Sequence, residues 1–246
     1  MKTTLSITIL TICILVMYYF VRPLFYSSEN RFRIAMCGRS TMGLWFKHWN
    51  WPYPLRIKFT YRSWPIAYHK YARDNLYLEY LPIDSPNIRD TRVEFGENML
   101  RSFTSYLDKG PYDAAFLKFC FVDFPIEDTQ WQARYDNLKK TVIAAHDSAA
   151  KKQLKLIVGN ALPLLTPSDT TIHLQKAFNT WLNEFAASHK DVMVFDFFNL
   201  LTDEEGRMRK ELARGNDDPH PNDRAFTLLD KAFFIKVSDW LGKQSF

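Results

Sequence analysis

The chain has 246 residues, of which 47% are hydrophobic and 24% charged, and this suits one globular domain with a sizeable core. The formal net charge is +5, but basic residues are scattered among acidic ones, so the sequence lacks a basic stripe and we expect no nucleic-acid partner. Only 8 glycines argue against a glycine-rich nucleotide-binding protein. The three cysteines match no metal motif, and we expect neither a metal nor another cofactor.

Residues 3–21 form an uncharged apolar run between Lys2 and Arg22. As a helix this run would be about 28 Å long, close to the thickness of bilayer hydrocarbon. A cleaved signal peptide is the alternative, but bulky residues follow the run where small residues would mark a cleavage site. The sequence therefore predicts an uncleaved signal anchor that places the protein on a membrane, with anchor and linker over residues 1–26 and a folded domain over residues 27–246.

The folded domain alternates between strand-like and helix-like segments. A crowded aromatic stretch from Leu44 to Ser63 has no clear period and is interpreted as a long loop. The predicted strands are residues 32–37, 75–83, 113–124, 154–164 and 192–198; the predicted helices are residues 97–110, 131–152, 172–189 and a last helix after Asn222. This order predicts the α/β class, with a parallel sheet between two helical layers.

Ser40 follows the first predicted strand directly, in the stretch RIAMCGRST. Ligands bind at the carboxyl ends of the strands in open parallel sheets. Ser40 is therefore a candidate nucleophile, and the alternative is a turn that happens to contain serine.

A second candidate lies near the carboxyl terminus, in the stretch GNDDPHPNDR. Pro219 and Pro221 flank His220 and make an ordinary helix unlikely to pass through it, so the stretch is predicted to be a rigid loop before the last helix. An imidazole is the usual base for a hydroxyl nucleophile, and Asp217 could fix its tautomer. The alternative is a turn-and-cap motif with an exposed histidine.

Together these residues resemble the SGNH (GDSL-type) hydrolase superfamily, which carries a G-D-S-like block after the first strand and a D-x-x-H-P block near the carboxyl end. The matches are Gly38-Arg39-Ser40, with Arg39 in place of the usual aspartate, and Asp217 to Pro221. The resemblance covers about residues 31–246. It implies a three-layer flavodoxin-like fold and metal-independent ester hydrolysis or acyl transfer, with Ser40 as nucleophile, His220 as base and Asp217 as orienting acid.

The resemblance also implies an oxyanion hole built from the nucleophile's amide, a glycine and an asparagine. We expect the Ser40 and Gly96 amides to contribute, although Gly96 could equally be an ordinary glycine at a helix start. Asp123 stands where the asparagine block would be, and Asn160 is an available amide. Asp123 is predicted to orient the Ser40 loop by pairing with Arg39; a substrate carboxylate is the alternative partner for Arg39.

The leading functional hypothesis is a membrane-anchored serine esterase or acyltransferase acting on ester-linked groups, expected to be acetyl, of a cell-surface carbohydrate. Flanking charges alone would leave the domain in the cytoplasm, but such a substrate places it outside. Four tryptophans near the serine could stack on sugar rings: Trp45, Trp49, Trp51 and Trp64. Alternatives are a lipid-directed esterase and a catalytically weakened glycan-binding module of an envelope polysaccharide assembly. A disulfide between Cys37 and Cys120 is left open.

Overall fold

The computed structural model describes residues 11, 13–14, 28–49, 69–83, 95–124 and 128–242. The predicted anchor over residues 3–21 therefore lies almost wholly outside the described residues, as do Trp51 and Trp64. Within the described ranges, no helix combines the length and the apolar character needed to cross a membrane.

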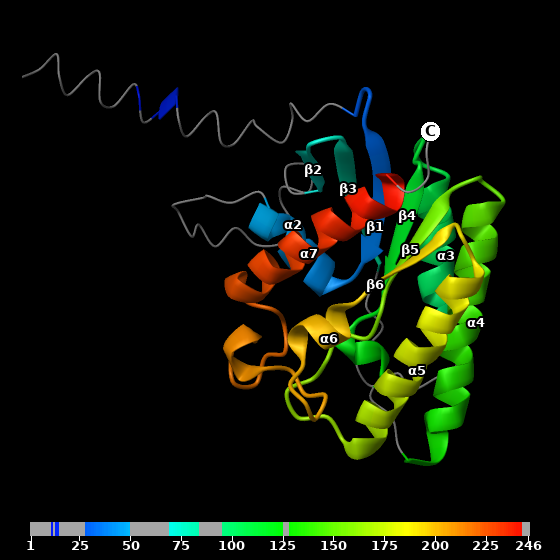
Figure 1. Ribbon diagram of the computed structural model, residues 1–246, viewed down its shortest axis with the longest axis vertical. Helices are drawn as coiled ribbons and strands as arrows, with labels where there is room; N and C mark the ends of the chain where they lie inside the picture. Colours follow the sequence, from blue (N-terminus) through cyan, green and yellow to red (C-terminus); the bar gives the residue numbers. More distant parts are fainter. Residues whose placement is uncertain are drawn as a thin grey trace, which may run out of the picture.

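One six-stranded sheet forms the centre of the domain, in the order β2-β3-β1-β4-β5-β6 (Figure 1). Neighbouring strands pair in parallel except at one edge, where β2 runs antiparallel to β3. The parallel strands follow the flavodoxin-like order, whose direction of winding reverses between β1 and β4. The strands are β1 (Phe32–Gly38), β2 (Lys70–Arg73), β3 (Leu76–Pro82), β4 (Ala114–Lys118), β5 (Lys155–Gly159) and β6 (Val192–Phe195). The predicted α/β class is confirmed, and β2 is a short edge strand that the sequence did not reveal.

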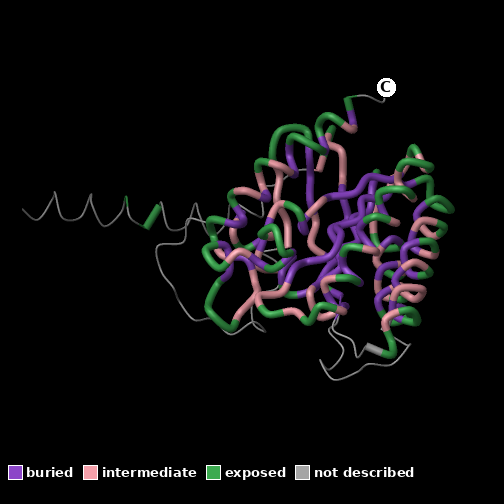
Figure 2. The backbone as a smooth tube through the Cα atoms, turned by 60° about the horizontal axis from the view of Figure 1, so that its bottom comes forward, coloured by how far each residue is buried: buried purple, intermediate pink, exposed green. Residues whose placement is uncertain are grey.

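Helices cover both faces of this sheet (Figure 1). One face is covered by α2 (Ser40–Trp49) and α7 (Asp223–Gly242), and the other by α3 (Phe95–Leu107), α4 (Trp131–Ala150) and α5 (Asp169–Ser188). The short α6 (Phe197–Leu201) follows β6. The buried residues concentrate along the strands and the inner sides of the helices (Figure 2).

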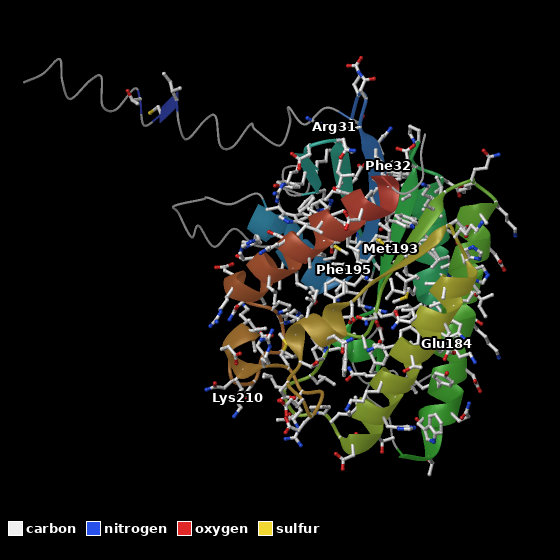
Figure 3. All side chains as sticks on the ribbon, viewed as in Figure 1. Arg31, Phe32, Glu184, Met193, Phe195 and Lys210 are labelled. Carbon is white, nitrogen blue, oxygen red and sulfur yellow. The ribbon has the colours of Figure 1, made fainter. Side chains whose placement is uncertain are left out.

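The two faces of the sheet carry separate apolar cores. Alternate residues of each strand point to opposite faces, so Met193 and Phe195 of β6 both pack on the α2 and α7 side (Figure 3). Cys37 belongs to the core under α3, α4 and α5, whereas Cys120 belongs to the other core. The cysteines of the described residues are free thiols, and this placement explains why Cys37 and Cys120 do not pair.

The stretch after Ser40 is a helix up to Trp49, not the start of a long loop. Its buried residues recur at helical spacing: Thr41, Met42, Trp45, Phe46 and Trp49. Trp45 and Trp49 both donate their indole N–H to Asp230 Oδ1 of α7, at 2.5 Å each. Because Trp45 is fully buried and Trp49 is 8% exposed, these two rings build the core and are not a sugar-stacking surface.

The third predicted strand is also shorter than expected. It ends at Lys118, and the 3-10 turn η2 (Phe121–Asp123) follows. The Asp123 carboxylate accepts the Cys120 backbone N–H at 2.6 Å, which closes the turn. The turn brings Phe121 and Asp123 to the carboxyl edge of the sheet, beside the point where β1 leads into α2.

Candidate active site

Ser40 and His220 meet at the carboxyl edge of the sheet although 180 positions separate them in the chain. The Ser40 hydroxyl lies 2.9 Å from His220 Nε2, within hydrogen-bonding distance. Ser40 is exposed and His220 half-buried. The structure therefore brings together the predicted nucleophile and the predicted base in a geometry that permits proton transfer between them.

The loop that carries His220 is held by backbone and side-chain hydrogen bonds. Arg214 donates its backbone N–H to the His220 carbonyl at 2.7 Å. The Asn222 side-chain amide donates to the carbonyls of Glu211 and Ala213, and its oxygen accepts the Ala225 N–H. Asn222 thus caps α7 and ties its start to the preceding loop.

The carboxylate that contacts His220 belongs to Asp218 rather than to the predicted Asp217. Asp218 Oδ1 lies 2.5 Å from His220 Nδ1 and also accepts the His220 backbone N–H at 3.0 Å. Aspartate side chains in turns commonly accept a hydrogen bond from the backbone two residues further on, as Asp218 does here from His220. Asp217 is exposed to solvent. Burial alone would raise the pKa of Asp218, but the hydrogen bonds from His220 outweigh burial and hold that pKa below its ordinary value.

The turn before Ser40 places the serine at the first position of α2. The Arg39 carbonyl accepts the N–H groups of Met42 and Gly43, which begins the helix, and also the Tyr80 hydroxyl at 3.2 Å. The N–H groups of Ser40 and Thr41 precede the first helical hydrogen bond and so point from a helix start, where donors are free. A helix start of this kind favours negative charge that develops beside the serine.

Arg39 and Asp123 form a buried ion pair below this turn. Arg39 Nη2 lies 3.3 Å from Asp123 Oδ1, and the two side chains are 1% and 0% exposed. Burial raises the pKa of Asp123, and the positive charge of Arg39 opposes that shift. The predicted pairing is present, and the burial of Arg39 leaves its guanidinium away from the surface where a substrate carboxylate would bind.

Gly96 lies at the second position of α3 and faces α4. A Cβ atom at this position would stand 2.3 Å from Thr141 Oγ1 and 3.0 Å from Asn137 Oδ1. Close helix packing therefore accounts for this glycine, which is the alternative that the sequence left open. Its role in an oxyanion hole stays a prediction.

Asn160 is fully buried and already engaged. Its amide donates to Asp196 Oδ1 at 2.8 Å, and its oxygen accepts the Phe198 N–H at 3.1 Å. These bonds join the end of β5 to the start of α6. The observed contacts give Asn160 a structural role at the edge of the sheet.

Three residues near the site were not singled out from the sequence. The sequence pattern favours Asp217 over Asp218 and predicts a strand through Phe121. The Phe121 and His220 ring centroids lie 5.0 Å apart, and the two rings are nearly perpendicular. Lys118 is fully buried at the end of β4, donates to the Phe119 carbonyl at 3.0 Å and lies over the Phe197 ring. A lysine inside an otherwise apolar strand was the signal that could have marked this position.

Comparison of the sequence with protein-family models and with curated proteins gave no match. Solved structures with the same fold do match. A GDSL-like lipase from Bacteroides thetaiotaomicron superposes with a TM-score of 0.57 at 10% identity, over 90% of this chain and 96% of the lipase chain. A member of the lipolytic protein G-D-S-L family from Veillonella parvula superposes with a TM-score of 0.50 at 16% identity, over 83% and 97% of the two chains. At these identities the similarity establishes the fold that this chain shares with such hydrolases.

Proposed function

We propose that this protein is a serine esterase or acyltransferase of the SGNH type. The observation that carries the proposal is the contact of 2.9 Å between Ser40 Oγ and His220 Nε2, with Asp218 on the other ring nitrogen. A hydroxyl, an imidazole and a carboxylate in series form the arrangement that activates serine for attack on a carbonyl. The shared fold supports the assignment, because two solved structures that superpose on this chain are a GDSL-like lipase and a lipolytic protein of the G-D-S-L family.

The reaction follows from this geometry. His220 Nε2 takes the proton of Ser40 as Oγ attacks the ester carbonyl, and Asp218 stabilises the imidazolium that forms. The Ser40 N–H at the start of α2 donates to the developing oxyanion. His220 then returns the proton to the leaving alcohol, an acyl-enzyme remains on Ser40, and water or a second hydroxyl resolves it.

For the substrate we retain the acetyl ester of a cell-surface carbohydrate, reached from a membrane anchor over residues 3–21. The support is the uncharged apolar run in the sequence and the exposed position of Ser40. The core positions of Trp45 and Trp49 remove one argument for sugar binding, so a lipid-directed ester substrate remains the second candidate. A faster reaction with p-nitrophenyl acetate than with p-nitrophenyl palmitate would favour the acetyl ester, and the reverse order would favour lipid.

A fluorophosphonate probe tests the enzymatic proposal directly. We expect the full chain to be labelled at Ser40 and to hydrolyse p-nitrophenyl acetate, and Ser40→Ala to lose both reactions. His220→Gln should lose most of the labelling while it keeps the fold. If folded wild-type protein is not labelled and hydrolyses no ester, the enzymatic assignment is wrong and a glycan-binding role takes its place.

A further inference from the structure

We propose that Arg39, Asp123 and Phe121 are positioning residues that connect the nucleophile to the base through a path of side chains separate from the Asp218 contact. The inference rests on the proposed function, because it assigns these residues a task in the same reaction. Arg39 precedes Ser40, Asp123 closes the turn after β4, and Phe121 touches His220.

The first step of the path is the ion pair below the nucleophile. A buried ion pair is rarely worth more to stability than apolar residues of the same size, because both charges lose their hydration. Such a pair does restrict geometry, since each charge has to face the other. The Arg39 carbonyl also accepts the first N–H groups of α2. Arg39 therefore takes part both in the ion pair and in the turn that positions Ser40.

The second step is the turn η2. Asp123 uses its two carboxylate oxygens on different partners: Oδ1 faces Arg39, and Oδ2 accepts the Cys120 N–H at 2.6 Å. The same carboxylate therefore closes the turn and fixes it to the nucleophile's loop. A second contact joins the two segments, because Thr41 Oγ1 lies 3.8 Å from Cys120 Sγ.

The third step is the ring of Phe121. Its plane makes an angle of 86° with the imidazole of His220, and the ring centroids are 5.0 Å apart. This is a favourable edge-to-face arrangement, and it limits the rotation of the imidazole. The Asp218 carboxylate that contacts the imidazole is 42% exposed, whereas the Arg39–Asp123 pair at the other end of the path is shielded from solvent.

Variants can separate positioning from stability. Asp123→Asn keeps an oxygen that can accept the Cys120 N–H but removes the buried negative charge that faces Arg39, so we expect it to lower thermal stability. Adding Arg39→Met removes the facing positive charge as well, and the double variant should regain much of that stability. If the pair positions the nucleophile, labelling of the double variant by the fluorophosphonate should still be about 10²-fold slower than wild type, since displacements of about 1 Å are known to cost that much.

Phe121→Leu tests the other end of the path, with Phe178→Leu as a control for the loss of an aromatic ring from the core. Phe178 is fully buried in the opposite core, against Phe119 and Phe124. Both variants should lose some stability, but only Phe121→Leu should lower kcat for p-nitrophenyl acetate, with KM nearly unchanged, and shift the pH dependence of labelling.

The outcomes distinguish the two proposals. If wild-type protein reacts at Ser40 and the folded double variant and Phe121→Leu react at the wild-type rate, the positioning role is refuted and the esterase assignment stands. If wild-type protein does not react at all, the esterase assignment and this inference are both rejected. Slow labelling of the stabilised double variant, together with normal labelling of Phe178→Leu, supports the inference.

Discussion

Replacing Asp218 and Asp217 separately by asparagine shows which of two adjacent carboxylates acts on His220. The two residues are matched in chemistry and lie in the same loop. The structure places Asp218 Oδ1 at 2.5 Å from His220 Nδ1 and leaves Asp217 exposed. We therefore expect Asp218→Asn to slow the reaction of Ser40 and Asp217→Asn to leave it almost unchanged.

The size of the effect follows from the hydrogen bonds of Oδ1. This oxygen accepts both the ring Nδ1–H and the His220 backbone N–H. In Asp218→Asn the side-chain oxygen should still face the His220 backbone N–H and Nδ1–H, because the NH₂ group in that place would meet the backbone N–H donor to donor. The tautomer is then retained, and only the charge is lost. Hydrogen bonds to charged groups contribute about 1.5–3 kcal/mol and neutral ones about 0.5–1.5 kcal/mol, a difference of about 1–1.5 kcal/mol.

This difference corresponds to a loss of roughly tenfold in kcat for Asp218→Asn, and the partial exposure of the carboxylate keeps the loss near that value. Asp218→Ala loses the tautomer control as well and should approach the ~10⁴-fold loss expected when a triad imidazole is held in the wrong tautomer. Steady-state hydrolysis of p-nitrophenyl acetate measures both. A greater loss in Asp217→Asn than in Asp218→Asn would refute the assignment of Asp218 and restore the residue predicted from the sequence.

Two further predictions concern stability. Burial alone would lower the pKa of His48, but Asp230 and Asp223 outweigh it and raise that pKa; the stabilisation is therefore full below the unfolded value of about 6.5 and should be lost as pH rises through the folded pKa. Melting temperatures across pH 5–9 should show this loss in wild type and not in His48→Gln, and equal pH slopes would contradict it. Gly96→Ala should cost about 1–3 kcal/mol in denaturant unfolding because its Cβ would meet Thr141, and Thr141→Ala in the same chain should recover part of that cost. If Gly96→Ala loses no stability, α3 and α4 can move apart at little cost and this reasoning is wrong.

The elements of this fold that the sequence predicted are those with a clear pattern of apolar residues. The buried strands β1, β3, β4 and β5 are short apolar runs, and α5 and α7 carry apolar residues at helical spacing. The sequence does not predict helix α2, because the tryptophan and phenylalanine residues of its inner face belong to a crowded aromatic stretch without a clear period. The edge strand β2 has only four residues, so it offered too little pattern to recognise.

The site residues could be predicted where the chain carries a distinctive combination of residues. They could not be predicted where two adjacent residues of the same type could fill the same role. Ser40 and His220 stand out because a serine after the first strand and a histidine between two prolines are uncommon. The choice between Asp217 and Asp218 depends on the backbone torsions of one turn, which sequence spacing does not supply. The pairing of Arg39 with Asp123 was predictable because each replaces a residue expected from the resemblance, and the charges are complementary.

The positions of the two helices that carry the site explain why its chemistry is feasible with few dedicated donors. Ser40 is the first residue of α2, and His220 lies three positions before α7 begins. The amino terminus of α2 therefore faces the reaction, and the partial positive charge there stabilises a developing oxyanion. The imidazolium that forms on His220 is stabilised by the carboxylate of Asp218, whose Oδ1 lies 2.5 Å from Nδ1 of the ring.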